Sequence, residues 1–289
     1  MLTQRRIDFF GGLHGNYLEL VVNFWIDQNS SYDIGLPQFD SQGACHVKNH
    51  SDTYVPITTC GHYSFGQHRF DSDDLVIRIV PKQQDMLIAV TNSFLRAGNQ
   101  LLDIENLHIN TYNKISKLSK LSGFLQTLER DHGRQDQYPR HVLRQYFYAM
   151  FDSYEHGLGM FTAWQPVRHW HDFEFRCFFD SCQFYQALQQ IAQFVNLDFR
   201  PTHRLASLHQ EFLQINQGLA SERKCLAVFE SIVAGQSTEI QLNIIEEAWL
   251  NYCISRTFNV YNAVELSQDS YPTNTKTISE ICYNYIQPC

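Results

Sequence analysis

The chain has 289 residues, of which 44% are hydrophobic, 14% are aromatic and 18% are charged. This composition can bury enough apolar surface to offset the entropy lost on folding, which argues against an intrinsically disordered protein. The net charge of −8, without any basic run, argues against a general nucleic-acid-binding surface, so we expect no nucleic-acid partner.

The eight cysteines predict reduced thiols, because none of them forms a C-x-x-C pair and their spacings show no tight framework. The N-terminal residues lack the apolar stretch of a signal peptide, and no apolar run approaches the roughly 20 residues of a membrane span. We therefore expect a cytoplasmic protein without a membrane span. A secreted protein with scattered disulfides is the alternative.

The first predicted unit is a strand, a glycine loop and a helix. Arg6–Phe10 is a short apolar run typical of a buried strand, and residues 11–16 follow as G-G-L-H-G-N. Tyr17–Ile26 is apolar nearly all round, which predicts a buried helix. Glycines in this position let the backbone turn sharply, and the N-terminus of the helix favours a phosphate or sulfate group. A tight connection that binds nothing is the alternative.

A polar segment at residues 28–53 predicts a surface excursion, and the next strand is predicted at Tyr54–Thr59. His62 follows it, preceded by Gly61. The carboxyl end of a parallel strand is where open α/β sheets place their chemistry, and the ordinary pKa of histidine suits a general base. The alternative is a solvated loop histidine.

The clearest strand is L-V-I-R-I-V at residues 75–80, because it is almost continuously apolar and is followed by Pro81. Arg78 interrupts this strand and needs a partner, since an unpaired buried charge is costly. The partner is predicted to be either a ligand phosphate or one of three nearby acids, namely Asp73, Asp74 and Asp85.

From about residue 84 to 160 the pattern is mostly helical, with a helix predicted over Pro139–Phe147. Phe173–Phe178 is predicted to return to the sheet as a strand. Asp180 is expected to cap a helix whose apolar face consists of Phe184, Leu188, Ile191 and Val195. A similar apolar face recurs at Leu205, Leu208, Phe212 and Ile215, and a capping box at Thr277–Glu280 predicts a last helix.

These elements predict one α/β domain over residues 1–289, with a central, mainly parallel sheet and a mostly helical extension at 200–289. A metal site is a minor alternative. His169, His171 and Asp172 lie close together with Cys177 nearby, but no H-E-x-x-H or paired-cysteine spacing accompanies them, so we expect no metal.

The order of these pieces over about residues 6–200 resembles the sulfotransferase family, which shares the P-loop-type α/β fold. The shared pieces are a strand–glycine loop–helix, a strand ending in Gly-His, a V-I-R-I-V strand followed by Pro and a basic residue, and a later strand, acidic turn and helix. The resemblance implies a three-layer domain and 3′-phosphoadenylyl sulfate as co-substrate. It also implies a small-molecule or glycan acceptor, since the many aromatic residues suit a sugar ring or an aromatic alcohol.

The resemblance places the 5′-phosphosulfate of that donor at one loop, made of Gly12, Leu13, His14, Gly15, Asn16 and Tyr17. Leu13 stands where the family commonly has a lysine that contacts the bridging oxygen. His14 or Lys82 is expected to compensate, or the protein is catalytically weak or inactive.

The resemblance also implies that His62 is the catalytic base, with His14 as a second catalytic residue. The 3′-phosphate site is implied at Arg78, Lys82 and Ser93, while the family's C-terminal Arg-Lys-Gly signature is absent. Two alternatives remain open at this point. One is a P-loop-type nucleotide or small-molecule kinase, which would need a loop lysine and a magnesium-binding pair, and the other is an inactive interaction protein.

Overall fold

The computed structural model describes a subset of the chain, consisting of residues 5–9, 12–26, 58–62, 73–95, 106–108, 137–139, 147–148, 151, 167–233, 240 and 242–258. The contacts divide the chain into two compact units. Unit 1 comprises Met1–Asn92 and Met160–Leu219, and unit 2 comprises Ser93–Gly159 and Ala220–Cys289. The single domain over residues 1–289 with an extension at 200–289 stays a prediction.

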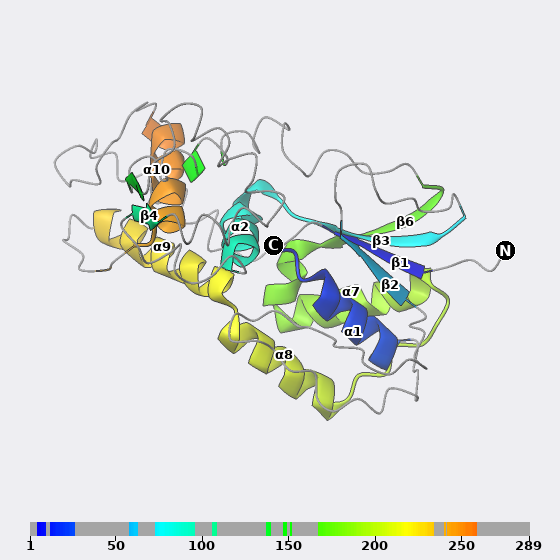
Figure 1. Ribbon diagram of the computed structural model, residues 1–289. Helices are drawn as coiled ribbons and strands as arrows, with labels where there is room; N and C mark the ends of the chain where they lie inside the picture. Colours follow the sequence, from blue (N-terminus) through cyan, green and yellow to red (C-terminus); the bar gives the residue numbers. More distant parts are fainter. Residues whose placement is uncertain are drawn as a thin grey trace. The chain divides into compact units, whose positions relative to one another are not determined.

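Unit 1 contains a four-stranded sheet with the order β2-β1-β3-β6. All three neighbouring pairs are parallel, so the prediction of an α/β fold with a parallel sheet is confirmed (Figure 1). The strands are β1 Arg5–Phe9, β2 Thr58–His62, β3 Leu75–Val80 and β6 His169–Glu174.

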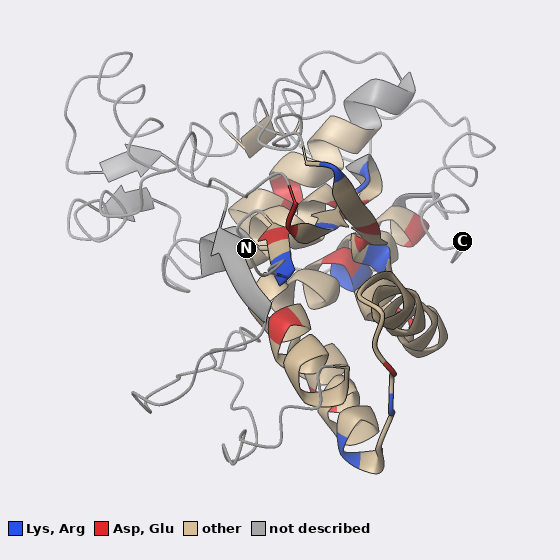
Figure 2. Ribbon diagram, turned by 90° about the vertical axis from the view of Figure 1, so that its right-hand side faces the viewer, with Lys and Arg blue, Asp and Glu red and all other residues tan. Residues whose placement is uncertain are grey.

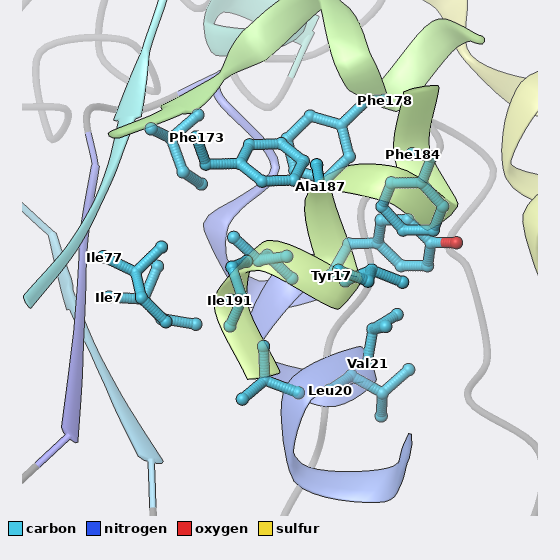
Figure 3. Packing of buried hydrophobic residues seen from close by; sticks show 14 of the residues in the cluster. Ile7, Tyr17, Leu20, Val21, Ile77, Phe173, Phe178, Phe184, Ala187 and Ile191 are labelled. Carbon is cyan, nitrogen blue, oxygen red and sulfur yellow. The ribbon is translucent and has the colours of Figure 1, made fainter. Parts of the chain in front are cut away.

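The core of unit 1 lies between one face of this sheet and two helices, α1 (Gly15–Trp25) and α7 (Ser181–Phe194). Figure 1 shows both helices on the same side of the strands. Side chains alternate along a strand, so every second residue reaches this core. Figure 3 shows Ile7 and Ile77 of the sheet facing Ile191 of α7, with Leu20 of α1 close by. We call this the core face of the sheet.

The helices of unit 1 follow the sequence signals closely. Asp180 Oδ1 accepts a hydrogen bond from the Gln183 N–H at 2.9 Å, which confirms the predicted cap of α7. The predicted apolar face of this helix is buried at Phe184, Leu188, Ile191 and Val195. The next helix, α8 (His203–Ile215), buries Leu205, Leu208 and Phe212 in the same way.

Three shorter elements follow the strands at the carboxyl edge of the sheet, namely η1 Gln83–Asp85, α2 Met86–Leu95 and η2 Phe175–Phe179. The buried Asp85 accepts from the Lys82 N–H at 2.8 Å and from Arg176 Nε at 2.8 Å. This ion pair joins the loop after β3 to the loop after β6.

Unit 2 contains a two-stranded antiparallel sheet, β4 (Asn106–His108) with β5 (Gln137–Pro139), and helix α10 (Ile244–Phe258). Helix α9 (Gln217–Val233) begins in unit 1 and continues into unit 2. Asn243 and Glu246 form a reciprocal capping box at the start of α10, with distances of 2.9 and 2.8 Å.

Two predicted elements are wrong in position. Pro139 was expected in the first turn of a helix, but it ends strand β5, where proline occupies the end of a short ladder. Phe173–Phe178 was expected to be a strand, but β6 ends at Glu174 and the apolar run continues as the 3-10 helix η2. A 3-10 turn places residues three apart on one side, so Phe175 and Phe178 are both buried.

Several predictions lie outside the described residues, namely the excursion at 28–53, the beginning of the strand at 54–57 and the capping box at 277–280. Within the described part of the chain, no helix is long and apolar enough to cross a membrane. The three-layer arrangement stays a prediction, because α1 and α7 both pack on the core face.

Candidate functional site

The carboxyl edge of the sheet in unit 1 is the place where ligand chemistry is expected. Strand β1 lies between β2 and β3: the chain passes from β1 to β2 on one side and then crosses to β3 on the other side. In open parallel sheets such a switch point opens a crevice at the carboxyl ends of the strands. The described part of the glycine loop, residues 12–14, lies at this edge, and His62 is the last residue of β2.

The glycine loop turns through two left-handed residues. Gly12 has a φ of 91° and His14 has a φ of 58°. A non-glycine residue in this region is uncommon, and here His14 is the N-cap of α1. Gly15 is required for another reason, because an added Cβ would clash with the ring of Phe9. The loop therefore makes the sharp turn that its glycines predict.

His14 is fixed by two asparagine side chains. Its Nε2 atom lies 2.9 Å from Asn92 Nδ2 and 2.9 Å from Asn216 Nδ2. Both amides are oriented by backbone donors: Asn92 Oδ1 accepts from the Gly218 N–H and Asn216 Oδ1 accepts from the Leu219 N–H. Since both amide nitrogens are donors, this arrangement favours the tautomer in which Nε2 accepts and the ring hydrogen is on Nδ1.

Four phenylalanine rings surround the His14 imidazole, with centroid distances between 4.8 and 6.1 Å, namely Phe175, Phe178, Phe179 and Phe212. The single lone pair of Nε2 faces both amide groups, and the predicted catalytic role of His14 stays a prediction.

Two predicted loop residues point into the core. Leu13 is 0% exposed and Tyr17 is 1% exposed. The Tyr17 hydroxyl lies 3.1 Å from His209 Nδ1, and the Tyr17 N–H donates to the His14 carbonyl at 3.0 Å. Both side chains therefore belong to the core, and the part of these residues in ligand binding stays a prediction. Asn16 is partly buried in the first turn of α1, where its amide and side chain can meet a bound anion.

The structure places the backbone of His62 and Ser93, while their side chains lie outside the described residues. His62 pairs with Phe9 across the β1–β2 ladder, at the carboxyl edge as predicted. Ser93 lies within α2. Their proposed roles, as base and as phosphate ligand, stay predictions.

The two predicted cations differ in burial. Lys82 Nζ lies 2.8 Å from Glu174 Oε2, in an ion pair whose two side chains are both exposed. Arg78 is buried on β3 and its guanidinium lies over the Trp170 ring, 5.2 Å from the centroid. The three acids expected to pair with Arg78 have other partners: Asp73 pairs with Arg168, Asp74 with Arg6 and Asp85 with Arg176.

The sequence reasoning missed Asp8. This residue is 0% exposed in β1, its register neighbour on β3 is Arg78, and neither carboxylate oxygen has a hydrogen-bond partner among the described residues. Burial raises the pKa of Asp8 from 3.8 to about 6, although the Arg78 charge opposes the shift. The available signal was an acid inside one apolar strand and a base inside the next.

Strand alternation separates the side chains of the minor metal-site alternative, because His171 and Asp172 are consecutive on β6 and face opposite sides of the sheet. In the described ranges, no group of three potential metal ligands comes together. The described cysteines Cys177, Cys182, Cys225 and Cys253 are free thiols. Burial and the nearby Glu174 raise the pKa of Cys177 to about 11, so its thiol stays protonated.

Comparison with protein-family models, with curated proteins and with solved structures gives no match to this chain.

Proposed function

We propose that the chain binds 3′-phosphoadenylyl sulfate at the loop between β1 and α1 and transfers its sulfuryl group to a hydroxyl or amine acceptor. One observation supports this proposal above the others. The left-handed turn at Gly12 and His14 joins β1 to the N-terminus of α1 at the switch point of a parallel sheet. Such a turn brings the backbone and the positive end of the helix dipole to the place where an anion binds.

In the proposed reaction, the acceptor oxygen or nitrogen attacks the sulfur atom while the bond from sulfur to the 5′-phosphate oxygen breaks. The acceptor proton goes to His62, and the electron pair of the broken bond stays on the departing nucleotide. The protein's task is to hold donor and acceptor in line and to stabilise the negative charge on the leaving phosphate.

We assign these tasks to fewer residues than the sequence implies. Asn16 is assigned to binding of the sulfate donor, because it lies in the first turn of α1. Lys82 is assigned to a phosphate, since its exposed pair with Glu174 is weak and can be exchanged for a ligand. His14 shapes the loop as the cap of α1, held by Asn92 and Asn216.

A second candidate function is nucleotide binding without catalysis. It is favoured by Leu13, whose buried side chain stands where the family resemblance implies a charged contact to the leaving group. The two candidates differ in one measurable property: turnover of the labelled sulfate donor with a panel of acceptors requires His62 only if the chain is an enzyme. A His62→Ala variant that binds nucleotide as the parent does, with no turnover in either protein, supports the non-catalytic function.

The direct test is a calorimetric titration of the full chain with adenosine 3′,5′-bisphosphate, the product nucleotide. We expect a Kd on the order of micromolar. An Asn16→Glu variant adds a negative charge at the first turn of α1, which suits the helix dipole but repels a phosphate. It should weaken binding at least about tenfold without loss of thermal stability.

Gln190→Glu is the matched control, because this residue is exposed on α7 and the variant changes the net charge equally. It should leave the affinity unchanged. Gly15 is unsuitable for such a variant, because any side chain there meets the Phe9 ring. Absence of nucleotide binding to the folded chain, or an equal loss in both variants, would contradict the proposal.

A further inference from the structure

The face of the sheet opposite α1 and α7 carries a row of residues that the proposed function does not use. In register across the four strands, Gly61 of β2, Asp8 of β1, Arg78 of β3 and Asp172 of β6 stand side by side. Neighbours in register project to the same side, so this row lies on one face, which we call the second face. Figure 2 shows acidic and basic residues interspersed along the described strands and helices.

Asp8 is the unusual member of this row. Its side chain is 0% exposed, and both carboxylate oxygens are without a hydrogen-bond partner among the residues that the structure describes. Burying a carboxylate without hydrogen bonds costs several kcal/mol, and native proteins rarely leave such a group unsatisfied. A buried carboxyl in this state is a candidate for binding a ligand that supplies the missing donors.

The register neighbours of Asp8 differ on its two sides. Arg78 directs its guanidinium to the Trp170 ring on β6, which is the side of β3 away from Asp8. On the other side of Asp8, the residue in register is Gly61, which has no side chain. Gly61 therefore places no side chain beside Asp8 on this face.

We propose that Asp8 anchors a binding site on the second face for a small ligand that presents an ammonium group, which would lie between Asp8 and the backbone at Gly61. The ammonium group supplies three N–H donors and a positive charge, which match two unsatisfied carboxylate oxygens. Burial raises the pKa of the Asp8 carboxyl, and the charge of Arg78 opposes this shift and so favours the ionised form. This site is separate from the glycine loop, and it does not depend on nucleotide binding or on sulfuryl transfer.

Protons compete with the amine for the same carboxylate. The Asp8 carboxyl has a pKa of about 6 in the free protein, so it is mostly ionised at about pH 7.5 and mostly protonated at about pH 5. Binding of an amine should therefore be about tenfold weaker at the lower pH.

The experiment is a calorimetric titration of the full chain with ethanolamine and with putrescine, each at about pH 7.5 and about pH 5. Ethylene glycol, which lacks the amine, is the ligand control. We expect saturable binding of at least one amine, no binding of ethylene glycol and the pH dependence described above. Asp8→Asn, which keeps the shape but removes the charge, should abolish binding, and Asp172→Asn in the same row should leave it unchanged.

Three results would overturn the site. They are no binding of either amine to the folded chain, equal binding by the parent and Asp8→Asn, or binding that does not weaken at the lower pH. If Asp8→Asn does not fold, the pH dependence and the ethylene glycol control still test whether an ammonium group binds to a carboxylate. Adenosine 3′,5′-bisphosphate titrated in parallel distinguishes this outcome from failure of the nucleotide site.

Discussion

The two faces of the parallel sheet are built from alternate residues of the same strands, yet the buried residues of one face are apolar and those of the other include charged ones. On the core face, Ile7, Ile77 and Phe173 are almost completely buried against α1 and α7. On the second face, the intervening residues Asp8 and Arg78 are also buried, but they are charged.

The comparison shows that burial alone does not identify the stabilising face. The core face gains free energy from each apolar side chain that it removes from water, whereas the second face loses free energy at Asp8. A face that costs stability is the one where binding or catalysis is expected to reside, because selection for folding alone would have replaced the charge.

The largest effect that separates the two faces is expected at Phe173. Its ring is 1% exposed and lies 4.7 Å from the ring of Phe178. Phe173→Ala should destabilise the protein by about 3–5 kcal/mol, because it removes a buried ring and leaves a cavity. The measurement is denaturant unfolding followed by circular dichroism. Asp172→Ala, the preceding residue on the exposed part of the second face, should change the stability by less than about 0.5 kcal/mol.

An intermediate and opposite effect is expected at Asp8. A carboxyl whose folded-state pKa is raised binds its proton more tightly in the folded protein, so stability is lost as the pH rises from 3.8 to about 6. The loss amounts to about 3 kcal/mol at neutral pH. Asp8→Asn should therefore be more stable than the parent above about pH 6, and the gap should close towards pH 4. Thermal unfolding of both proteins across this range is the measurement. A gap that is independent of pH would contradict burial as the cause of the shift.

The smallest effect is expected at Trp170, which is 50% exposed on the second face. Trp170→Ala removes the ring beneath the Arg78 guanidinium and should cost about 0.5–1 kcal/mol. Trp170→Phe keeps an aromatic face and should recover part of this loss. Comparison of the two variants by chemical denaturation isolates the ring–cation contact, and equal stabilities for the two would show that it contributes nothing.

The helices were predictable where one short-range rule was enough. The cap of α7 by Asp180 and the apolar face from Phe184 to Val195 depend on residues three or four apart, and both are confirmed. The predicted bounds of the first strand were also close to the observed ones, since β1 spans Arg5–Phe9 and Arg6–Phe10 was predicted.

The rest depended on contacts between distant residues. Strand β6 was misplaced because His169, Trp170, Asp172 and Glu174 are exposed, so an apolar strand pattern was absent until β3 supplied its partner. The tautomer of His14 depends on Asn92 and Asn216, which are 78 and 202 residues away in sequence. The acid at Asp8 and the base at Arg78 could be recognised as neighbours only once the strand register was known.

The discontinuous make-up of unit 1 has a consequence for the time course of its synthesis. One edge of strand β3 stays unpaired until β6 has been made, so the sheet of unit 1 is complete only after residue 174 has left the ribosome. Ile77 and Ile79 share their core cluster with α7, and this helix is complete only after Phe194 has been translated. Distant pairings of this kind fold slowly and expose apolar strands in the meantime. The nascent chain is therefore expected to need chaperone protection until α7 and α8 have been translated.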